Sequence, residues 1–270
     1  MLISAKEIIQ QSIALYKKHF SLFFHYAMLL LVGTVVAILL SQLLSLLFST
    51  PSPNGIVYKP LLSSAMVVLA WVIYYIFSLW ISVAMIQTIK ECYEGKKPKV
   101  LRVTTSNSIK LVWPMFVVSI IAGLIIFGGM LLLVIPGTIF SVWYAFSVYA
   151  VIFDNKKNMA ALTASKQLVA GKWWGVLWRL FAPSFVFGVL LLLIEGILSL
   201  IEAGILLLAP GTPLVTGALS FASLNSGTLL FMFTMLAVYL GSLLITLLIT
   251  TLFTIAPTIL YIELKKSVTK

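Results

Sequence analysis

Cysteine, histidine and aspartate are nearly absent from this 270-residue chain, which limits the chemistry that it can carry out. Cys92 is the only cysteine, so the chain can form neither an internal disulfide nor a cysteine-based metal cluster. The only histidines are His19 and His25 and the only aspartate is Asp154, which leaves few groups for metal binding or general-base catalysis. Motifs of zinc proteases, serine hydrolases, P-loop proteins and dinucleotide-binding proteins are also absent. We therefore expect a protein that is not an enzyme and that has no catalytic residue, cofactor or metal.

Charged residues are scarce as well: they make up 9% of the chain, whereas soluble domains carry about 25%. Hydrophobic residues make up 61% and gather in six long stretches. Because a helix of roughly 20 apolar residues crosses the hydrocarbon core of a bilayer, each stretch is a candidate span. The expected spans are Tyr26–Phe48, Leu61–Ile89, Leu111–Ile135, Thr138–Phe153, Leu177–Leu208 and Leu229–Ile262. The predicted fold class is all-α: a polytopic transmembrane bundle of six helices with short interfacial amphipathic helices, in one transmembrane domain over residues 1–270.

The basic residues lie in alternate gaps between the apolar stretches. Of the 18 Lys and Arg residues, only Lys59 falls in a gap predicted to face outwards, and the others lie in the N-terminal arm, the inner gaps or the tail. This positive-inside pattern predicts a multi-pass protein of the cytoplasmic (inner) membrane with both termini in the cytoplasm. The formal net charge of +11 does not indicate nucleic acid, because the basic residues form no surface stripe of their own. The expected partners are membrane lipids, with a membrane or cytosolic protein as a second alternative.

One pattern recurs where the second, fourth and sixth stretches end. Each exit segment consists of an acidic residue, any residue and two lysines: Glu94-Gly95-Lys96-Lys97, Asp154-Asn155-Lys156-Lys157 and Glu263-Leu264-Lys265-Lys266. The pattern is typical of a threefold repeat of an amphipathic helix and a helical hairpin, with units at 1–97, 98–157 and 158–270. Convergence is the alternative, because helix ends at an anionic membrane surface favour lysine and aromatic residues in any protein.

Each unit opens with a polar stretch that we expect to lie on the membrane as an amphipathic helix. In the first opening, Ser4 and Glu7 have the spacing of a capping box. Its apolar face consists of Ile8, Ile9, Ile13, Tyr16 and Phe20. The middle opening covers 101–108, and the third runs from Asn158, a predicted N-cap, to Gly171, a predicted C-terminal glycine. Two roles stay open for these openings: an elbow that orients the next span, and a docking surface.

Two acidic residues lie inside the fifth apolar stretch, where charge is costly and indicates function by default. Glu195, Ser199 and Glu202 are spaced by four and three residues, which puts them on one face of a helix. Glu202 is expected near the outer headgroups, about 34 Å along the helix from Arg179. Glu195 lies deeper, so we expect it to be protonated, or to face water or the bundle interior. It is either a proton-coupled or cation-binding site or a hydrogen-bonding staple to another helix.

Hydroxyl side chains recur at every fourth position of the sixth stretch. They are Ser242, Thr246, Thr250, Thr254 and Thr258. Hydroxyls at this spacing can bond the carbonyl one turn back and allow close helix packing, or they can form a polar lane for a substrate. The candidate intramembrane polar site therefore comprises Glu195, Ser199, Glu202, Thr246, Thr250 and Thr254. Glycines are interpreted as close-packing positions in the same way: Gly123, Gly128, Gly129, Gly188, Gly196, Gly204 and Gly241.

The stretch between residues 135 and 180 carries motifs of a known family. They are a predicted turn at Pro136-Gly137, the aromatic segment Val142-Trp143-Tyr144-Ala145-Phe146, Asp154, Ala160-Ala161-Leu162 with Ser165, and Leu168-Val169-Ala170-Gly171-Lys172-Trp173-Trp174. On these motifs the chain resembles the membrane-domain family named after bacterial glycerophosphoryl diester phosphodiesterases, and the related YciC-like proteins. The segments at 12–20 and 260–265 fit the same pattern, so the resemblance spans most of the chain.

The resemblance implies a six-helix prokaryotic membrane protein rather than an activity. In some relatives this region is fused to a soluble phosphodiesterase domain that carries the chemistry. The acidic and histidine catalytic residues of that domain are absent from this sequence. The expected function is therefore that of a membrane scaffold or a lipid-related support or partner protein. The alternative is a small transporter or channel that uses Glu195 and the hydroxyls of the sixth stretch.

Overall fold

The computed structural model describes residues 3–48, 58–96, 106–207 and 226–269. Within these ranges the chain forms nine α-helices and no strand, which confirms the all-α prediction. They are α1 (Ala5–Lys18), α2 (Phe20–Phe48), α3 (Tyr58–Tyr93), α4 (Ser106–Leu132), α5 (Val134–Tyr144), α6 (Ser147–Asp154), α7 (Asn158–Val169), α8 (Trp173–Leu207) and α10 (Ser226–Thr269). Most of the predicted middle opening and of the loop at 209–227 lies outside the described residues.

Six helical segments are long and apolar enough to cross a membrane, as predicted. They are Phe20–Ser45, Ser63–Tyr93, Ser108–Leu132, Val134–Asp154, Trp173–Leu207 and Phe231–Val268. In each of these spans fewer than half of the residues are buried inside the protein. Apolar helices with that much exposed surface are stable in lipid and not in water. The chain is therefore a multi-pass membrane protein.

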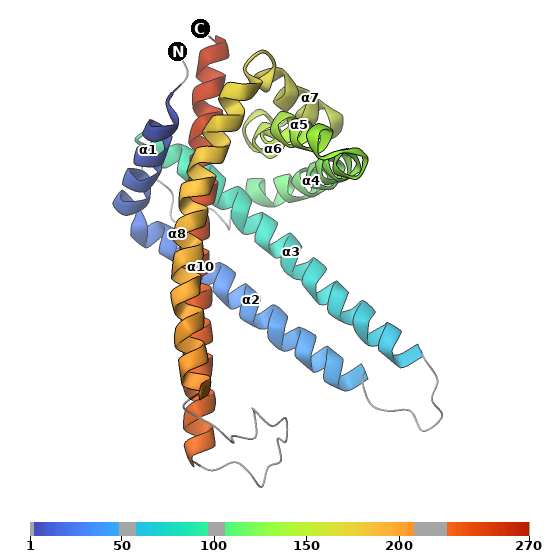
Figure 1. Cartoon of the computed structure of the whole chain (residues 1–270). Coiled ribbons are helices and arrows are strands. Elements are labelled where there is room, and N and C mark those ends of the chain that lie inside the picture. Colours follow the sequence, from blue (N-terminus) through green and yellow to red (C-terminus); the bar gives the residue numbers. More distant parts are fainter. Residues whose placement is uncertain (1–2, 49–57, 97–105, 208–225, 270) are drawn as a thin grey trace.

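The helices are arranged as three hairpins that share one end of the molecule (Figure 1). The hairpins α2–α3, α4–α5 and α8–α10 have the most extensive helix–helix contacts in the described chain. They point in different directions away from the shared end, and both termini lie at that end. Here we call this end the base and the opposite ends of the hairpins the tips.

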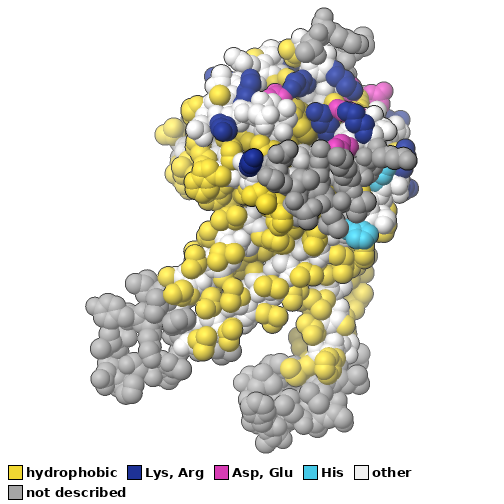
Figure 2. Space-filling model, turned by 180° about the vertical axis from the view of Figure 1, so that it is seen from behind, with side chains coloured by type: hydrophobic (Ala, Val, Ile, Leu, Met, Phe, Trp, Pro, Cys, Tyr) yellow, Lys and Arg dark blue, Asp and Glu magenta, His cyan; other side chains and the backbone are white. Residues whose placement is uncertain are grey.

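The hydrophobic core lies at the base, where all three hairpins meet. Fully buried side chains come from α1, α2, α3, α7, α8 and α10, among them Ile8, Phe23, Ile89, Leu162, Val176 and Ile259. Towards the tips the side chains are exposed: Leu39 is 64%, Leu131 73% and Leu200 74% accessible. Figure 2 shows the same division on one face, with charged side chains gathered over the base and apolar ones below.

The fourth span differs from the prediction, which made Thr138–Phe153 one continuous helix. The helix is interrupted at Ala145 and Phe146, between the end of α5 and the start of α6. Ser165 of α7 fills the break: its Oγ accepts a hydrogen bond from the Phe146 amide at 3.0 Å and donates to the Trp143 carbonyl at 2.6 Å. A break is tolerated inside an apolar helix only where such a partner satisfies the freed backbone groups.

The turn before the fourth span also lies earlier than expected. The Pro136-Gly137 pair was predicted to form the turn, but α4 ends at Leu132 and Leu133 is the N-cap of α5. Pro136 therefore lies in the first turn of α5, where its missing amide hydrogen costs no helical bond. Gly137 lies against α4, because a Cβ atom there would be 2.4 Å from Cγ and 2.8 Å from the backbone nitrogen of Met130.

The first and third openings are elbows packed against the protein's own helices. The predicted capping box of α1 is present, with Ser4 Oγ accepting from the Glu7 amide at 3.2 Å and Glu7 Oε2 from the Ser4 amide at 2.9 Å. The apolar face of α1 packs on α10 and α8, and Ile8 is fully buried there. Protein therefore covers Ile8 and parts of Ile9, Ile13 and Tyr16, which we had expected to lie on lipid, whereas Phe20 is 46% exposed.

The third opening, α7, is similar in its packing but not in its capping. Leu162 and Val169 are buried against neighbouring helices, whereas Met159 is 58% exposed. Lys157, and not Asn158, is the N-cap, and its side chain makes no capping bond. Gly171 follows the helix with φ +75°, a left-handed conformation that favours glycine, as predicted.

Candidate functional site

The predicted polar face of α8 is directed towards α10. Glu195 Oε1 and Thr246 Oγ1 are hydrogen-bonded to each other across the hairpin. Thr246 Oγ1 also lies 2.9 Å from the Ser242 carbonyl oxygen, one turn back along α10. Because a hydroxyl carries a single proton, Thr246 can donate to only one of these two oxygens at a time. This contact joins the two helices of the hairpin, and we call it the staple; both predicted roles of Glu195 stay predictions.

The other two members of this face lie nearer to the tip. Ser199 and Glu202 of α8 line an open hollow together with Met235 and Tyr239 of α10. The Ser199 hydroxyl donates to the Gly196 carbonyl oxygen at 2.9 Å, so its own proton is used within the helix. The prediction that Glu195, Ser199 and Glu202 share one face is confirmed, and that face lies along the α8–α10 seam.

The hydroxyls of α10 mostly bond to their own helix, as expected for packing positions. Ser242 donates to the Tyr239 carbonyl, Thr250 to the Leu247 carbonyl and Thr258 to the Thr254 carbonyl, at 2.6 to 2.9 Å. Thr250 and Thr254 lie one and two turns nearer to the base than Thr246, so they are not brought to the Glu195 contact. The six predicted residues are thus split between a staple, a hollow and a helix surface.

The glycine prediction is confirmed at one position only. A Cβ atom at Gly129 would lie 2.7 Å from Cδ2 of Phe140 and 3.1 Å from the Cα of Gly137, so α4 and α5 approach closely there. The other predicted close-packing glycines have no neighbour within 4 Å of an added Cβ: Gly123, Gly128, Gly188, Gly196, Gly204 and Gly241. Among the described residues, these glycines do not mark close packing.

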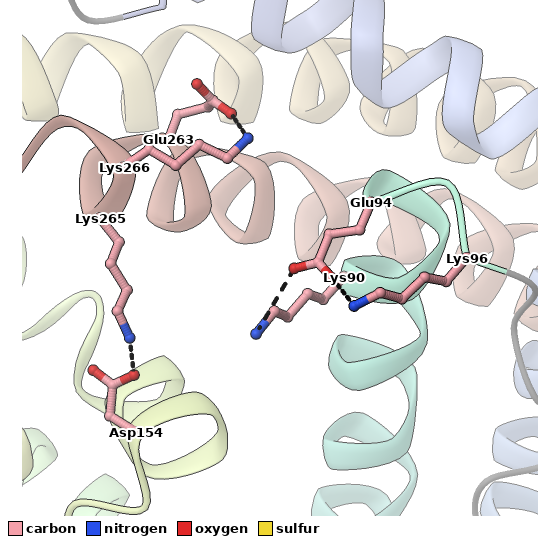
Figure 3. A network of polar contacts seen from close by, with 7 residues as sticks. All are labelled: Lys90, Glu94, Lys96, Asp154, Glu263, Lys265 and Lys266. Carbon is pink, nitrogen blue, oxygen red and sulfur yellow. Dashed lines mark hydrogen bonds and ion pairs between the residues drawn. The ribbon is translucent and has the colours of Figure 1, made fainter. Parts of the chain in front are cut away.

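The three exit segments meet at the base and form a polar cluster, shown in Figure 3. We call this cluster the junction. It consists of Lys90, Glu94, Lys96, Asp154, Glu263, Lys265 and Lys266. The residues come from the ends of α3, α6 and α10, which are the last helices of the three predicted units.

The first link of the junction joins the exits of α10 and α6. Lys265 forms an ion pair with Asp154, whose side chain is only 19% exposed. The Tyr261 hydroxyl donates to the other oxygen of the same carboxylate at 3.1 Å. The Tyr261 ring also packs on Phe153, with ring centroids 5.6 Å apart. Asp154, the only aspartate of the chain, is thus held by two residues of the last helix.

The second link joins the exits of α3 and α10. Tyr93 and Glu263 are hydrogen-bonded, with the phenol oxygen 3.1 Å from the carboxylate. Lys266 lies 2.6 Å from the same carboxylate oxygen, and its Nζ is 5.2 Å from the centre of the Tyr93 ring. A cation placed over an aromatic face in this way is attracted by the ring.

The third link joins the exits of α3 and α6 and closes the ring of contacts. Lys90 Nζ lies 4.7 Å from the centre of the Phe153 ring and 3.9 Å from a Glu94 oxygen. Glu94 also binds Lys96 at 2.6 Å, and this hydrogen bond lowers the pKa of the Glu94 carboxyl below its ordinary value. The ends of α3, α6 and α10 therefore contact one another in pairs.

Sequence reasoning recognised the exits as similar but did not predict that they touch. The signal was the shared acid-x-Lys-Lys pattern, which was interpreted as a threefold repeat or as convergence at a membrane surface. The described residues contain no group of three or more His, Cys, Asp or Glu side chains that could hold a metal. The junction is a network of ion pairs that is bordered by the rings of Tyr93, Phe153 and Tyr261.

Comparisons of the chain with protein-family models, with curated proteins and with solved structures found no match. The resemblance to the phosphodiesterase-associated membrane domains stays a prediction.

Proposed function

We propose that this protein is a non-catalytic scaffold of the cytoplasmic (inner) membrane, with the junction and both termini in the cytosol. The observation that supports this function best is the division between base and tips. Three apolar hairpins diverge from one polar junction, and the described hairpins present exposed apolar side chains that suit contact with lipid. A shape of this kind suits a protein that supports lipids or holds a membrane or cytosolic protein partner.

The proposed orientation is supported by the position of the lysines. The junction carries Lys90, Lys96, Lys265 and Lys266, and exposed Lys156 and Lys157 lie beside it. A cytosolic base would obey the positive-inside rule. Single-cysteine variants in a Cys92→Ser background test this directly. Leu207→Cys should react with an impermeant maleimide in intact spheroplasts, and Lys157→Cys only after permeabilisation; the reverse result would refute the orientation.

Crosslinking in native membranes, followed by mass spectrometry, tests the scaffold itself. We expect a reproducible set of crosslinked proteins or lipids on the cytosolic base or on the hairpins. The control is the same treatment after detergent extraction, which should abolish contacts that depend on the membrane. A chain that crosslinks to no other protein and co-purifies with no defined lipid class would contradict a scaffold.

The alternative transport function depends on Glu195, which is half-buried and hydrogen-bonded to Thr246. A staple predicts that Glu195→Gln lowers stability modestly, by about 0.6 kcal/mol, as for other hydrogen bonds between membrane helices. We expect no proton-coupled uptake in liposomes with either the wild type or this variant. Uptake by the wild type that disappears in Glu195→Gln would establish the transporter instead.

A further inference from the structure

The hollow at the tip of the α8–α10 hairpin has the chemistry of a cation site. Glu202 and Ser199 supply oxygen atoms from α8, and Tyr239 supplies a phenol ring from α10. Ala203, Leu206 and Met235 complete the lining, which is mostly apolar. A single carboxylate next to an aromatic ring and an apolar wall is an arrangement that recognises an ammonium group attached to a hydrocarbon chain.

The charge of Glu202 is not balanced within the described chain. Glu202 makes no ion pair with any described side chain, although it is partly buried. The lysines and arginine of the described spans and elbows gather at the base, at the other end of the hairpin. At 1.5 Å per residue, about 34 Å of helix separates Arg179 from Glu202. A carboxylate in a mostly apolar hollow, far from the basic residues at the base, is stabilised by a cation from outside the described chain.

The depth of the hollow in the bilayer indicates which kind of molecule carries the cation. Tyr239 lies about 36 Å from Glu263 along α10, so Glu202 and Tyr239 are at matching heights on the two antiparallel helices. The hydrocarbon core is about 30 Å thick, which places both residues at the headgroup level of the leaflet opposite the base. Tyrosine is enriched at this level in membrane proteins.

We propose that this hollow binds a primary ammonium group, with Glu202 as its charge partner and the face of Tyr239 as its aromatic partner. In a bilayer this group is carried by phosphatidylethanolamine, and free ethanolamine is the soluble source of the same chemistry. The Glu202 carboxylate accepts hydrogen bonds from the ammonium, and the apolar wall contacts the lipid chain. The inference rests on the proposed orientation only for the choice of leaflet.

Native mass spectrometry of the full chain in detergent micelles tests the site. The protein is mixed with phosphatidylethanolamine or phosphatidylglycerol of identical acyl chains, and the retained lipid is counted. We expect wild type to retain the ethanolamine lipid about tenfold better, and Glu202→Gln to lose that preference because its amide carries no charge. Glu202→Asp should keep much of the preference, and Glu7→Gln, on the exposed capping box of α1, should not change it.

Two further measurements distinguish binding of the lipid from binding of its headgroup alone, and control for misfolding of the variants. An excess of free ethanolamine should displace the lipid only partly if the acyl chain contributes, and fully if the headgroup alone binds. Tyr239→Leu should weaken retention of the ethanolamine lipid about threefold while leaving the carboxylate in place. Equal retention of both lipids by wild type, or an unchanged preference in well-folded Glu202→Gln, would refute the site. Neither result depends on whether the protein is a scaffold.

Discussion

The base and the tips of this protein are held together by different forces. At the base, segments far apart in the sequence meet, and buried apolar side chains combine with ion pairs and stacked rings. Towards the tips, each helix contacts mainly its own hairpin partner. Contacts there include the hydrogen bond between the hydroxyls of Thr34 and Tyr74, the close approach of α4 and α5 at Gly129, and the staple between Glu195 and Thr246. Contacts at the base thus set how the three hairpins are arranged. Contacts between the two helices of each hairpin hold that hairpin together.

The difference has a physical origin in the solvent of each region. In lipid there is no hydrophobic force between apolar helices, so close packing and interhelical hydrogen bonds are what remain. The elbows α1 and α7 at the base carry charged and polar surfaces, as water-exposed helices do, and burial of apolar side chains stabilises them. Four changes test this contrast between burial at the base and seams at the tips.

The largest effect is expected from a matched pair of leucine truncations. Leu162 of α7 is 1% exposed in the core of the base, whereas Leu200 of α8 is 74% exposed. Leu162→Ala should lower the free energy of unfolding by about 2 to 5 kcal/mol, because it removes buried surface and leaves a cavity. Leu200→Ala should change it by less than about 0.5 kcal/mol. Reversible unfolding in mixed micelles measures both, and equal losses would refute the contrast.

The next effect comes from the seam between α4 and α5. Gly137→Ala should destabilise by about 1 to 3 kcal/mol, because its Cβ would overlap the backbone of Met130 and force the helices apart. Gly123 lies in the same hairpin with open space around it, so Gly123→Ala is the control. That control should be neutral or slightly stabilising, since alanine is the better helix former. The same unfolding assay decides, and a tolerated Gly137→Ala would mean that the seam is not closely packed.

The glycines of the spans show which features of the fold the sequence could predict and which it could not. The spans were predictable because hydropathy is a local property of the sequence. Close approach was not, because Gly129 and Gly188 look alike in sequence, yet only Gly129 meets a partner helix. The break between α5 and α6 was missed for a similar reason, since the Ser165 hydroxyl that supports it lies about 20 residues further along the chain.

The candidate site was predicted in part on the same grounds. Helical periodicity placed Glu195, Ser199 and Glu202 on one face, which the structure confirms. It could not show that Thr246 is the partner of Glu195, because nothing local fixes the register between two antiparallel helices. The junction was missed for the same reason: Asp154 and Lys265 are 111 residues apart.

A double-mutant cycle at the junction should give a smaller effect than either packing change. Asp154→Asn removes the charge that Lys265 and Tyr261 share, and we expect a loss of about 1 kcal/mol, because Lys265 is half-exposed. Combining it with Lys265→Gln measures the coupling between the two residues, which should be close to the single loss. Lys157→Gln, an exposed neighbour, is the control. Additive effects of Asp154→Asn and Lys265→Gln would mean that the link does not hold the hairpins.

The smallest effect is a pH dependence at the edge of the junction. The hydrogen bond from Lys96, helped by the charge of Lys90, keeps the pKa of Glu94 below its ordinary value of 4.5. The folded state therefore binds the Glu94 proton less readily than the unfolded state does. The stability from this group is complete above about pH 4.5 and is lost as the pH falls through the lower, folded-state pKa.

Unfolding midpoints measured from pH 6 to pH 3.5 should therefore fall less steeply in Glu94→Gln than in the wild type. Glu7 needs its own variant, because its bond to the Ser4 backbone amide also lowers its pKa. Glu7→Gln should remove a separate share of the slope and leave the share of Glu94 intact, since the two residues lie in different elements. If neither variant reduces the fall of the unfolding midpoint at low pH, the carboxylates at the base are solvated charges that do not contribute to stability. In that case the apolar core alone accounts for the stability of that end.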